Sequence, residues 1–272
     1  MSKLWDQMLL VPTVVRLASR APRNPDAAWE GYWRGIRTTG RSGDVLWDSD
    51  SSAERAQYSE AIAAHFDPAL PVVDVGCGNG THTRWLAGLF PRVLGIDVSK
   101  GAIEMASKEA AGIQNADFMV LDAAAAGAGE TLLERIGPAN VFVRGVFHVL
   151  KPGKQAAMAA NLRKVIGNSG RVLLAETNFR GNSLGYLTEL GATRQSMPVQ
   201  LRRALENLPR PGHFGARERH GVFSDSDWQL IADGPVNIEV VPMNANGLPQ
   251  WVPGYYALLS GAENSGTEHG RA

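Results

Sequence analysis

The sequence predicts a doubly wound α/β fold whose sheet is mostly parallel, with one antiparallel strand near its edge. Short apolar runs rich in β-branched residues alternate with segments of helix length, and Gly, Pro, Asp or Asn bound each run. This alternation indicates parallel strands that are buried on both faces. The five runs are 72–75, 93–96, 118–121, 141–143 and 172–175. The runs 236–241 and 251–259 are expected to be two closing strands.

Composition and charge limit the function classes. The chain has 272 residues, 44% of them hydrophobic, which suits one elaborated domain without disulfide or metal staples. A net charge of zero lacks the broad basic surface expected of a nucleic-acid binder. The single cysteine, Cys77, excludes an internal disulfide and a cysteine-based zinc site, and no His/carboxylate spacing indicates another metal. No apolar run approaches the ~18 residues of a membrane span, and the first 20 residues lack a signal-peptide pattern. We therefore expect a cytoplasmic protein without nucleic-acid or membrane partners.

Two segments outside the alternation are expected to cover the sheet. Residues 1–66 are predicted to form a helical lid that ends in a capped helix at 53–66. Residues 180–222 interrupt the 67–260 sheet domain after the fifth strand, and they hold seven arginines, three glutamates and no lysine. This charge predicts a cap over an anionic acceptor such as a carboxylate or phosphate. The alternative is a solvated or interface helix at 201–208.

The C-terminal part is expected to begin with a helix at 224–232, where Ser and Asp residues offer an N-cap. Small polar residues at 261–272 predict a disordered tail. The sequence leaves the oligomeric state open, and a homodimer is compatible with it.

A glycine-rich turn follows the first predicted strand, in the segment Asp74-Val-Gly-Cys-Gly-Asn-Gly80. Glycine lets the backbone turn tightly and approach a ligand without a Cβ in the way. The helix expected at 81–89 presents free N–H groups and the positive end of its dipole to the same ligand. By itself this turn predicts a nucleotide-like ligand.

Acidic residues at the ends of the next two strands sharpen this prediction. Asp97, followed by Val98, ends the second strand, where a carboxylate can accept both hydroxyls of a ribose. Asp122, followed by Ala123, ends the third strand and is placed to accept a hydrogen bond from an exocyclic adenine amine. Because ligands of open α/β sheets lie at the carboxyl ends of the strands, we expect the three strand ends to converge on one adenosine.

In combination, these motifs resemble the class I, Rossmann-like family of S-adenosylmethionine-dependent methyltransferases over about residues 70–180. The turn from Asp74 to Gly80 looks like the family's first motif, Asp97 matches its ribose-binding acid, and Asp122 matches its adenine-side acid. The segment 141–148 resembles the fourth-strand segment that floors the active site. The resemblance implies a seven-stranded sheet, S-adenosylmethionine as the donor, and a small-molecule acceptor, specialised metabolites included, methylated at O, N, S or C. The donor contacts expected on this basis are Asp74, Gly76, Cys77, Gly78, Asp97, Val98, Asp122, Ala123, Arg144 and Trp33.

Three further side chains are candidates with a structural alternative. His148 lies just past the fourth strand, where it can take a proton from an acceptor hydroxyl or amine because histidine titrates near working pH; otherwise it is a pocket-wall residue. Arg144 orients His148 or an acidic substrate, or it forms a salt bridge elsewhere. Trp29-Glu-Gly-Tyr-Trp33, with Trp47 downstream, is similar to the entry of thiopurine-type S-methyltransferases. This implies that Trp33 closes over the donor, and a packed core is the alternative.

Other functions stay open from the sequence. An NAD-type Rossmann protein would normally carry Gly-x-Gly-x-x-Gly instead of the Gly-x-Gly-x-Gly that follows Asp74. A donor-binding enzyme of this fold could instead catalyse a non-methylating reaction such as a cyclisation. Methylation of a macromolecule is disfavoured by the neutral charge and by Arg144-Gly-Val-Phe147, where amino-methylating enzymes carry an Asn-Pro-Pro-Tyr type of segment.

Overall fold

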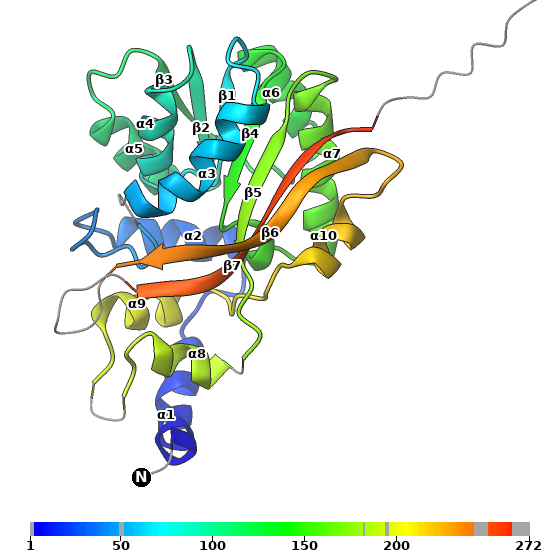
Figure 1. Ribbon diagram of the computed structural model, residues 1–272. Coiled ribbons are helices and arrows are strands. Elements are labelled where there is room, and N and C mark those ends of the chain that lie inside the picture. Colours follow the sequence, from blue (N-terminus) through cyan, green and yellow to red (C-terminus); the bar gives the residue numbers. More distant parts are fainter. Residues whose placement is uncertain (1–2, 49–51, 182, 194–195, 242–249, 263–272) are drawn as a thin grey trace, which may run out of the picture.

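The computed structural model describes residues 3–48, 52–181, 183–193, 196–241 and 250–262 (Figure 1). The helices are α1 (Lys3–Ala18), α2 (Pro25–Arg34), α3 (Ser52–His65), α4 (Thr81–Ala87), α5 (Lys100–Glu109), α6 (Ala128–Ile136), α7 (Pro152–Ile166), α8 (Ser183–Glu189), α9 (Val199–Asn207) and α10 (Ala216–Val222), with a 3-10 turn η1 (Phe147–Val149). The strands are β1 (Val72–Val75), β2 (Val93–Asp97), β3 (Ala116–Val120), β4 (Asn140–Arg144), β5 (Val172–Thr177), β6 (Trp228–Val240) and β7 (Gln250–Gly261).

These strands form one seven-stranded sheet in the order β3-β2-β1-β4-β5-β7-β6. Strands β1 to β5 pair in parallel, and β7 runs antiparallel to both of its neighbours, β5 and β6. The predicted doubly wound sheet with one antiparallel strand near its edge is confirmed. The strand order reverses between β1 and β4, and in open α/β sheets ligands bind at the carboxyl ends of the strands beside such a point.

Apolar side chains cover the sheet on both faces, as the largely apolar strands require. On one face, Leu132 of α6 and Leu162 of α7 belong to a buried cluster with β1, β2, β4 and β5. On the other face, Tyr58 of α3 and Leu86 of α4 pack with Phe142 of β4. Although the sequence groups α3 with the N-terminal lid, its apolar side chains lie on the sheet.

The N-terminal segment and the insert after β5 pack against each other. Figure 1 shows α1, α8 and α9 gathered at one end of the molecule, with α2 between them and α5. Arg20, after α1, pairs with Glu206 of α9 at 2.7 Å. Arg203 of α9 pairs with Asp44, in the loop after α2, at 2.7 Å. The two covering segments that the sequence predicts separately therefore form one joined cover.

The prediction of a helix at 224–232 is wrong. The N–H of Trp228 donates to the carbonyl oxygen of Ser224, which closes a single turn, and β6 then begins at Trp228. β6 pairs with β7 along its length, with a bulge between Leu230 and Ala232. A strand partner that lies more than twenty residues away overrides the local capping signal. Of the tail expected to be disordered, residues 263–272 lie outside the described residues. Among the described residues, no helix is long and apolar enough to cross a membrane.

Candidate active site

Glycines shape the turn after β1. Gly76 and Gly78 have φ of +71° and +55°, a region that other residues rarely adopt. A Cβ at Gly76 would overlap Cγ2 of Val146, in the loop after β4. A Cβ at Gly78 would lie 2.7 Å from the ring of Trp33 in α2. The turn is therefore a backbone cradle with close neighbours on two sides, and only glycine fits at these two positions.

Hydrogen bonds hold the ends of the first three strands together. Asp97, the last residue of β2, accepts the N–H of Gly78 at 3.1 Å and the N–H of Ser99 at 2.9 Å. The carbonyl oxygen of Asp97 accepts the N–H of Leu121, just past β3, at 2.9 Å, and Asp122 follows directly. Burial raises the pKa of Asp97 to about 6, although these backbone hydrogen bonds lower it. The three strand ends therefore lie together, and their contact with an adenosine stays a prediction.

Asp122, the acid expected on the adenine side, has partners within the protein. Asp122 accepts the N–H of Ala124 at 2.9 Å, and its other oxygen pairs with the ammonium group of Lys154 in α7. Ala123, between Asp122 and Ala124, is buried, and Val98, next to Asp97, is half-buried. One oxygen of Asp122 thus holds the loop, while the other meets an ammonium group that is half exposed.

Asp74 and Cys77 are both buried. Asp74 is buried in β1 and accepts the hydroxyl of Thr83 in α4 at 2.6 Å. Burial raises the pKa of Asp74 to about 7, while the hydrogen bond from Thr83 lowers it. Burial also raises the pKa of the Cys77 thiol well above its usual value. Asp74 therefore ties the strand to the helix that follows the turn, and Cys77 is not an activated nucleophile.

Helix α2 closes over the turn. Trp33 is buried among Ile36, Val45 and Ala102, so its ring cannot easily retreat from the turn. The Glu30 carboxylate accepts the hydroxyl of Ser99 at 2.7 Å, and it also accepts the N–H of Gly101 at the start of α5, at 3.1 Å. α2 is thus bound to the segment that follows the ribose-side acid.

Arg144 lies in an internal ion pair. Its guanidinium donates to both carboxylate oxygens of Glu54 in α3, at 2.5 and 2.8 Å. It also donates to the carbonyl oxygens of Trp47 and Glu239, at 3.0 and 3.2 Å. Glu54 in turn accepts the hydroxyl of Tyr58 at 2.8 Å and is fully buried. Of the two interpretations of Arg144, the structure contains the salt bridge, which joins β4 to α3 and β6.

His148 is paired with a glutamate that the sequence analysis missed. Glu176, near the end of β5, is fully buried, and its Oε2 lies 2.7 Å from Nδ1 of His148. The same carboxylate accepts the N–H groups of Val146 and Phe147 at 2.9 Å each. Glu176 directly follows the predicted strand at 172–175. Asp97 and Asp122 were selected by the same signal, an acid at the end of a predicted strand, so this signal could have found Glu176.

The insert after β5 runs beside this pair. The N–H of Gly212 donates to the carbonyl oxygen of His148 at 2.8 Å, and the N–H of Phe214 donates to that of Thr177 in β5 at 2.9 Å. The insert therefore crosses the carboxyl ends of β4 and β5. Its exposed arginines are Arg180, Arg202, Arg210 and Arg217. Arg194 lies outside the described residues.

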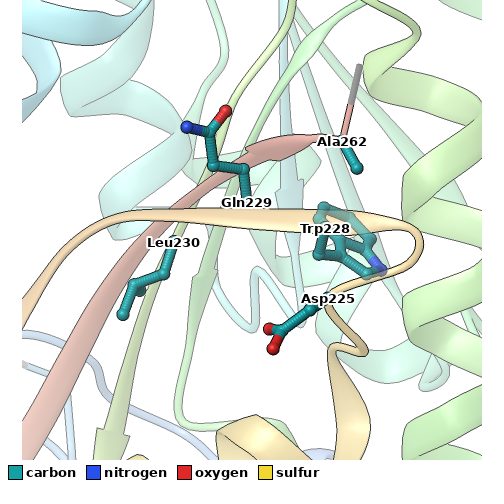
Figure 2. A pocket seen from close by; sticks show the side chains of 5 residues that line it. All are labelled: Asp225, Trp228, Gln229, Leu230 and Ala262. Carbon is teal, nitrogen blue, oxygen red and sulfur yellow. The ribbon is translucent and has the colours of Figure 1, made fainter. Parts of the chain in front are cut away.

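A surface cavity of about 450 Å³ lies elsewhere in the molecule. Figure 2 shows the residues around it, which come from the segment before β6, the start of β6 and the end of β7: Asp225, Trp228, Gln229, Leu230 and Ala262. Leu259 in β7 is opposite Val172, the first residue of β5. This cavity is therefore at the amino ends of the parallel strands, away from the glycine turn.

The fold and the site define a class of protein. A seven-stranded doubly wound sheet, a glycine cradle after β1 and acids at the ends of β2 and β3 are the features of a class I methyltransferase. The comparisons with known proteins agree. Residues 72–170 match the family model described as a methyltransferase domain.

A solved structure, a SAM-dependent methyltransferase from Anabaena variabilis, superposes with a TM-score of 0.75 and 29% identity, covering 89% of this chain and 97% of that one. The ubiquinone biosynthesis O-methyltransferase of Sinorhizobium medicae is 27% identical over 208 residues, which are 68% of this chain and 81% of that protein. Methyltransferase nsrG of Aspergillus novofumigatus is 27% identical over 218 residues, 76% of each chain. Residues 72–170 thus match a methyltransferase domain, and the fold is similar to that of a solved SAM-dependent methyltransferase over most of both chains.

Proposed function

We propose that this protein transfers a methyl group from S-adenosylmethionine to an O, N, S or C atom of a small-molecule acceptor, a specialised metabolite among the candidates. The observation that carries the proposal is the joining of three strand ends, in which the carboxylate of Asp97 binds the N–H of Gly78 and its carbonyl oxygen binds that of Leu121. One of the similar proteins supports the small-molecule part by name, as an O-methyltransferase of ubiquinone biosynthesis.

The residues at the strand ends fit the donor. Gly76 is exposed and Gly78 is buried, and at both positions a Cβ would collide with a neighbouring side chain. Asp97 offers carboxylate oxygens for ribose hydroxyls, and Asp122 offers one oxygen to an adenine amine when Lys154 gives way. When bound, S-adenosylmethionine supplies an electrophilic methyl group. The residues that we assign to the donor side are Gly76, Cys77, Gly78, Asp97, Val98, Asp122, Ala123 and Trp33.

Asp74 and Arg144 have a supporting role in this proposal. The carboxylate of Asp74 accepts the hydroxyl of Thr83, and Arg144 donates four N–H groups to Glu54 and to two carbonyl oxygens. Both side chains therefore hold the elements around the cradle in place. Their loss should weaken donor binding through the shape of the fold.

The acceptor side lies between His148 and the insert, at the ends of β4 and β5. We assign His148 as the candidate base, since it is half-buried beside the cradle and a segment of the insert binds its backbone. Arg210 lies two residues before Gly212, which contacts His148, and Arg180 lies three residues after the end of β5. Both arginines are exposed, and they support an anionic acceptor.

Calorimetry with S-adenosylmethionine and its demethylated product tests donor binding. We expect Asp97→Ala to weaken binding at least tenfold, while Asp225→Ala, an exposed acid at the opposite end of the sheet, leaves it unchanged. Equal binding by all three proteins would discard the assignment of Asp97.

Mass spectrometry of reactions with a panel of small phenols, amines, thiols and carboxylic acids then tests transfer. A product that gains one methyl group supports the proposal. A converted acceptor of unchanged mass would favour the non-methylating alternative, such as a cyclisation.

A further inference from the structure

The carboxylate of Glu176 is surrounded by hydrogen-bond donors. Its carboxylate has no exposed surface, and one oxygen accepts the N–H groups of both Val146 and Phe147 at 2.9 Å. The other oxygen accepts the N–H of His148 at 3.2 Å and lies 2.7 Å from Nδ1 of the same residue. A buried carboxylate that binds three consecutive peptide N–H groups fixes the loop after β4 as well as the imidazole ring.

This arrangement determines which ring nitrogen of His148 is basic. An ionised carboxylate has only acceptor atoms, so Nδ1 must carry a proton to make the 2.7 Å hydrogen bond with Glu176. In a neutral imidazole the lone pair is then on Nε2. Among the residues that the structure describes, the side-chain hydrogen bond of His148 is made by Nδ1, and none is made by Nε2. The pairing therefore leaves one basic nitrogen free.

The loop that carries His148 packs against the glycine turn. Val146, two residues before His148, lies against Gly76 so closely that a Cβ there would overlap it. Gly145 begins the loop with a φ of +75°, and a Cβ at this position would lie 3.7 Å from Cε1 of His148. On the other side, the N–H of Gly212 in the insert binds the carbonyl oxygen of His148. The loop that carries His148 thus lies between the glycine turn and the insert.

We propose that Glu176 is a positioning residue that holds His148 with Nε2 as the basic nitrogen, and that the acceptor is a molecule with a proton to lose, a hydroxyl, phenol or N–H group. This inference rests on the proposed function. The acceptor heteroatom gains the methyl group and its proton passes to Nε2. The electron pair of the broken carbon–sulfur bond remains on sulfur. Glu176 then faces an imidazolium, whose positive charge its carboxylate stabilises.

The test is the tautomer of His148 in the full chain, read by ¹⁵N NMR with the His148→Gln variant to assign its signals. We expect the wild-type ring to carry its proton on Nδ1. In Glu176→Gln the amide N–H₂ can donate to Nδ1, so the proton should move to Nε2 in most molecules. Glu218→Gln alters a second His–Glu pair, the one between His213 and Glu218 in the insert; it is the matched control and should leave His148 unchanged.

Several outcomes would overturn the inference. They are a wild-type ring protonated on Nε2 and a Glu176→Gln ring that keeps the wild-type tautomer. If Glu176→Gln does not fold, Glu176→Asp keeps the charge but shortens the side chain by one methylene, and it should give a mixture of tautomers. An unchanged single tautomer in the aspartate variant would also refute the positioning role.

Calorimetry with the demethylated donor separates this inference from the proposed function. Donor affinity within about twofold of wild type in Glu176→Gln, together with a changed tautomer, supports a positioning role. A wild type that does not bind the donor would refute the proposed function and leave the tautomer result standing. With a phenol that the wild type methylates, we expect kcat to fall ~100-fold or more, as for loss of a general base, with KM unchanged. The double variant with His148→Gln should be no slower than His148→Gln alone, and an additive loss would contradict the inference.

Discussion

Replacing Gly80 by alanine tests how tightly the glycine turn is packed from behind. Gly80 is the N-cap of α4, with φ +76° and ψ +17°. A Cβ there would lie 2.9 Å from the ring of Phe118 and 3.1 Å from Cβ of Ala106. A Cβ at Gly95 would also meet Phe118, at 2.8 Å, so the ring lies against two glycines and cannot move away from both.

Gly127 provides a control within the same chain. It is the N-cap of α6, with φ +80° and ψ +1°, and a Cβ there would meet nothing within 4 Å. Both alanine variants bear the left-handed backbone strain of ~1–2 kcal/mol, and both gain the same stiffening of the unfolded chain. Only Gly80→Ala adds the overlap with Phe118, and overpacking of this kind costs ~1–3 kcal/mol. We therefore expect Gly80→Ala to be less stable than Gly127→Ala by ~1–3 kcal/mol.

Denaturant unfolding of the two variants and wild type measures this difference. Adding Phe118→Leu to each variant should remove most of the difference, because the smaller side chain leaves room for the new methyl group. Equal stability of Gly80→Ala and Gly127→Ala would refute the packing argument. So would a difference that Phe118→Leu leaves unchanged.

Three further predictions concern buried charges. Glu54→Gln leaves the Arg144 guanidinium without its buried partner and should reduce the free energy of unfolding by ~3–5 kcal/mol, measured by denaturation; an unchanged midpoint would contradict the structural role of the pair. The pKa of Asp74 is about 7 in the folded state, against an ordinary value of 3.8. The folded state therefore holds this proton to higher pH than the unfolded state does, so wild-type stability should fall as pH rises from about 4 to 7. Thermal melts of Asp74→Asn at pH 5 and pH 8 should differ less than those of wild type, and an equal pH dependence would count against this. The pKa of Asp97, about 6, predicts that donor affinity measured by calorimetry weakens as pH falls below 6 while Asp97→Asn shows no such step.

The parallel strands and the glycine turn could be predicted from the sequence because their signals are local. The run 141–143 is apolar throughout, and the run 72–75 is apolar except for Asp74, which is the pattern of strands buried on both faces. A positive φ at Gly76 is nearly restricted to glycine, so the residue type itself reports the backbone conformation. Parallel strands place their carboxyl ends at one edge, so Asp97 and Asp122 could be brought together before any coordinates were known.

Pairings between distant residues were decided only by the tertiary structure. Arg144 and Glu54 are separated by 90 residues, and nothing near Arg144 in the sequence reveals that its charge is matched inside the fold. His148 and Glu176 are 28 residues apart, and their contact depends on β4 and β5 lying side by side. The stretch from Trp228 became a strand because β7 supplies its hydrogen bonds, which a local capping signal cannot foresee. Backbone conformation depends mainly on the residue type at each position. The partner of a buried charge or of a strand edge depends instead on which distant segments the fold brings side by side.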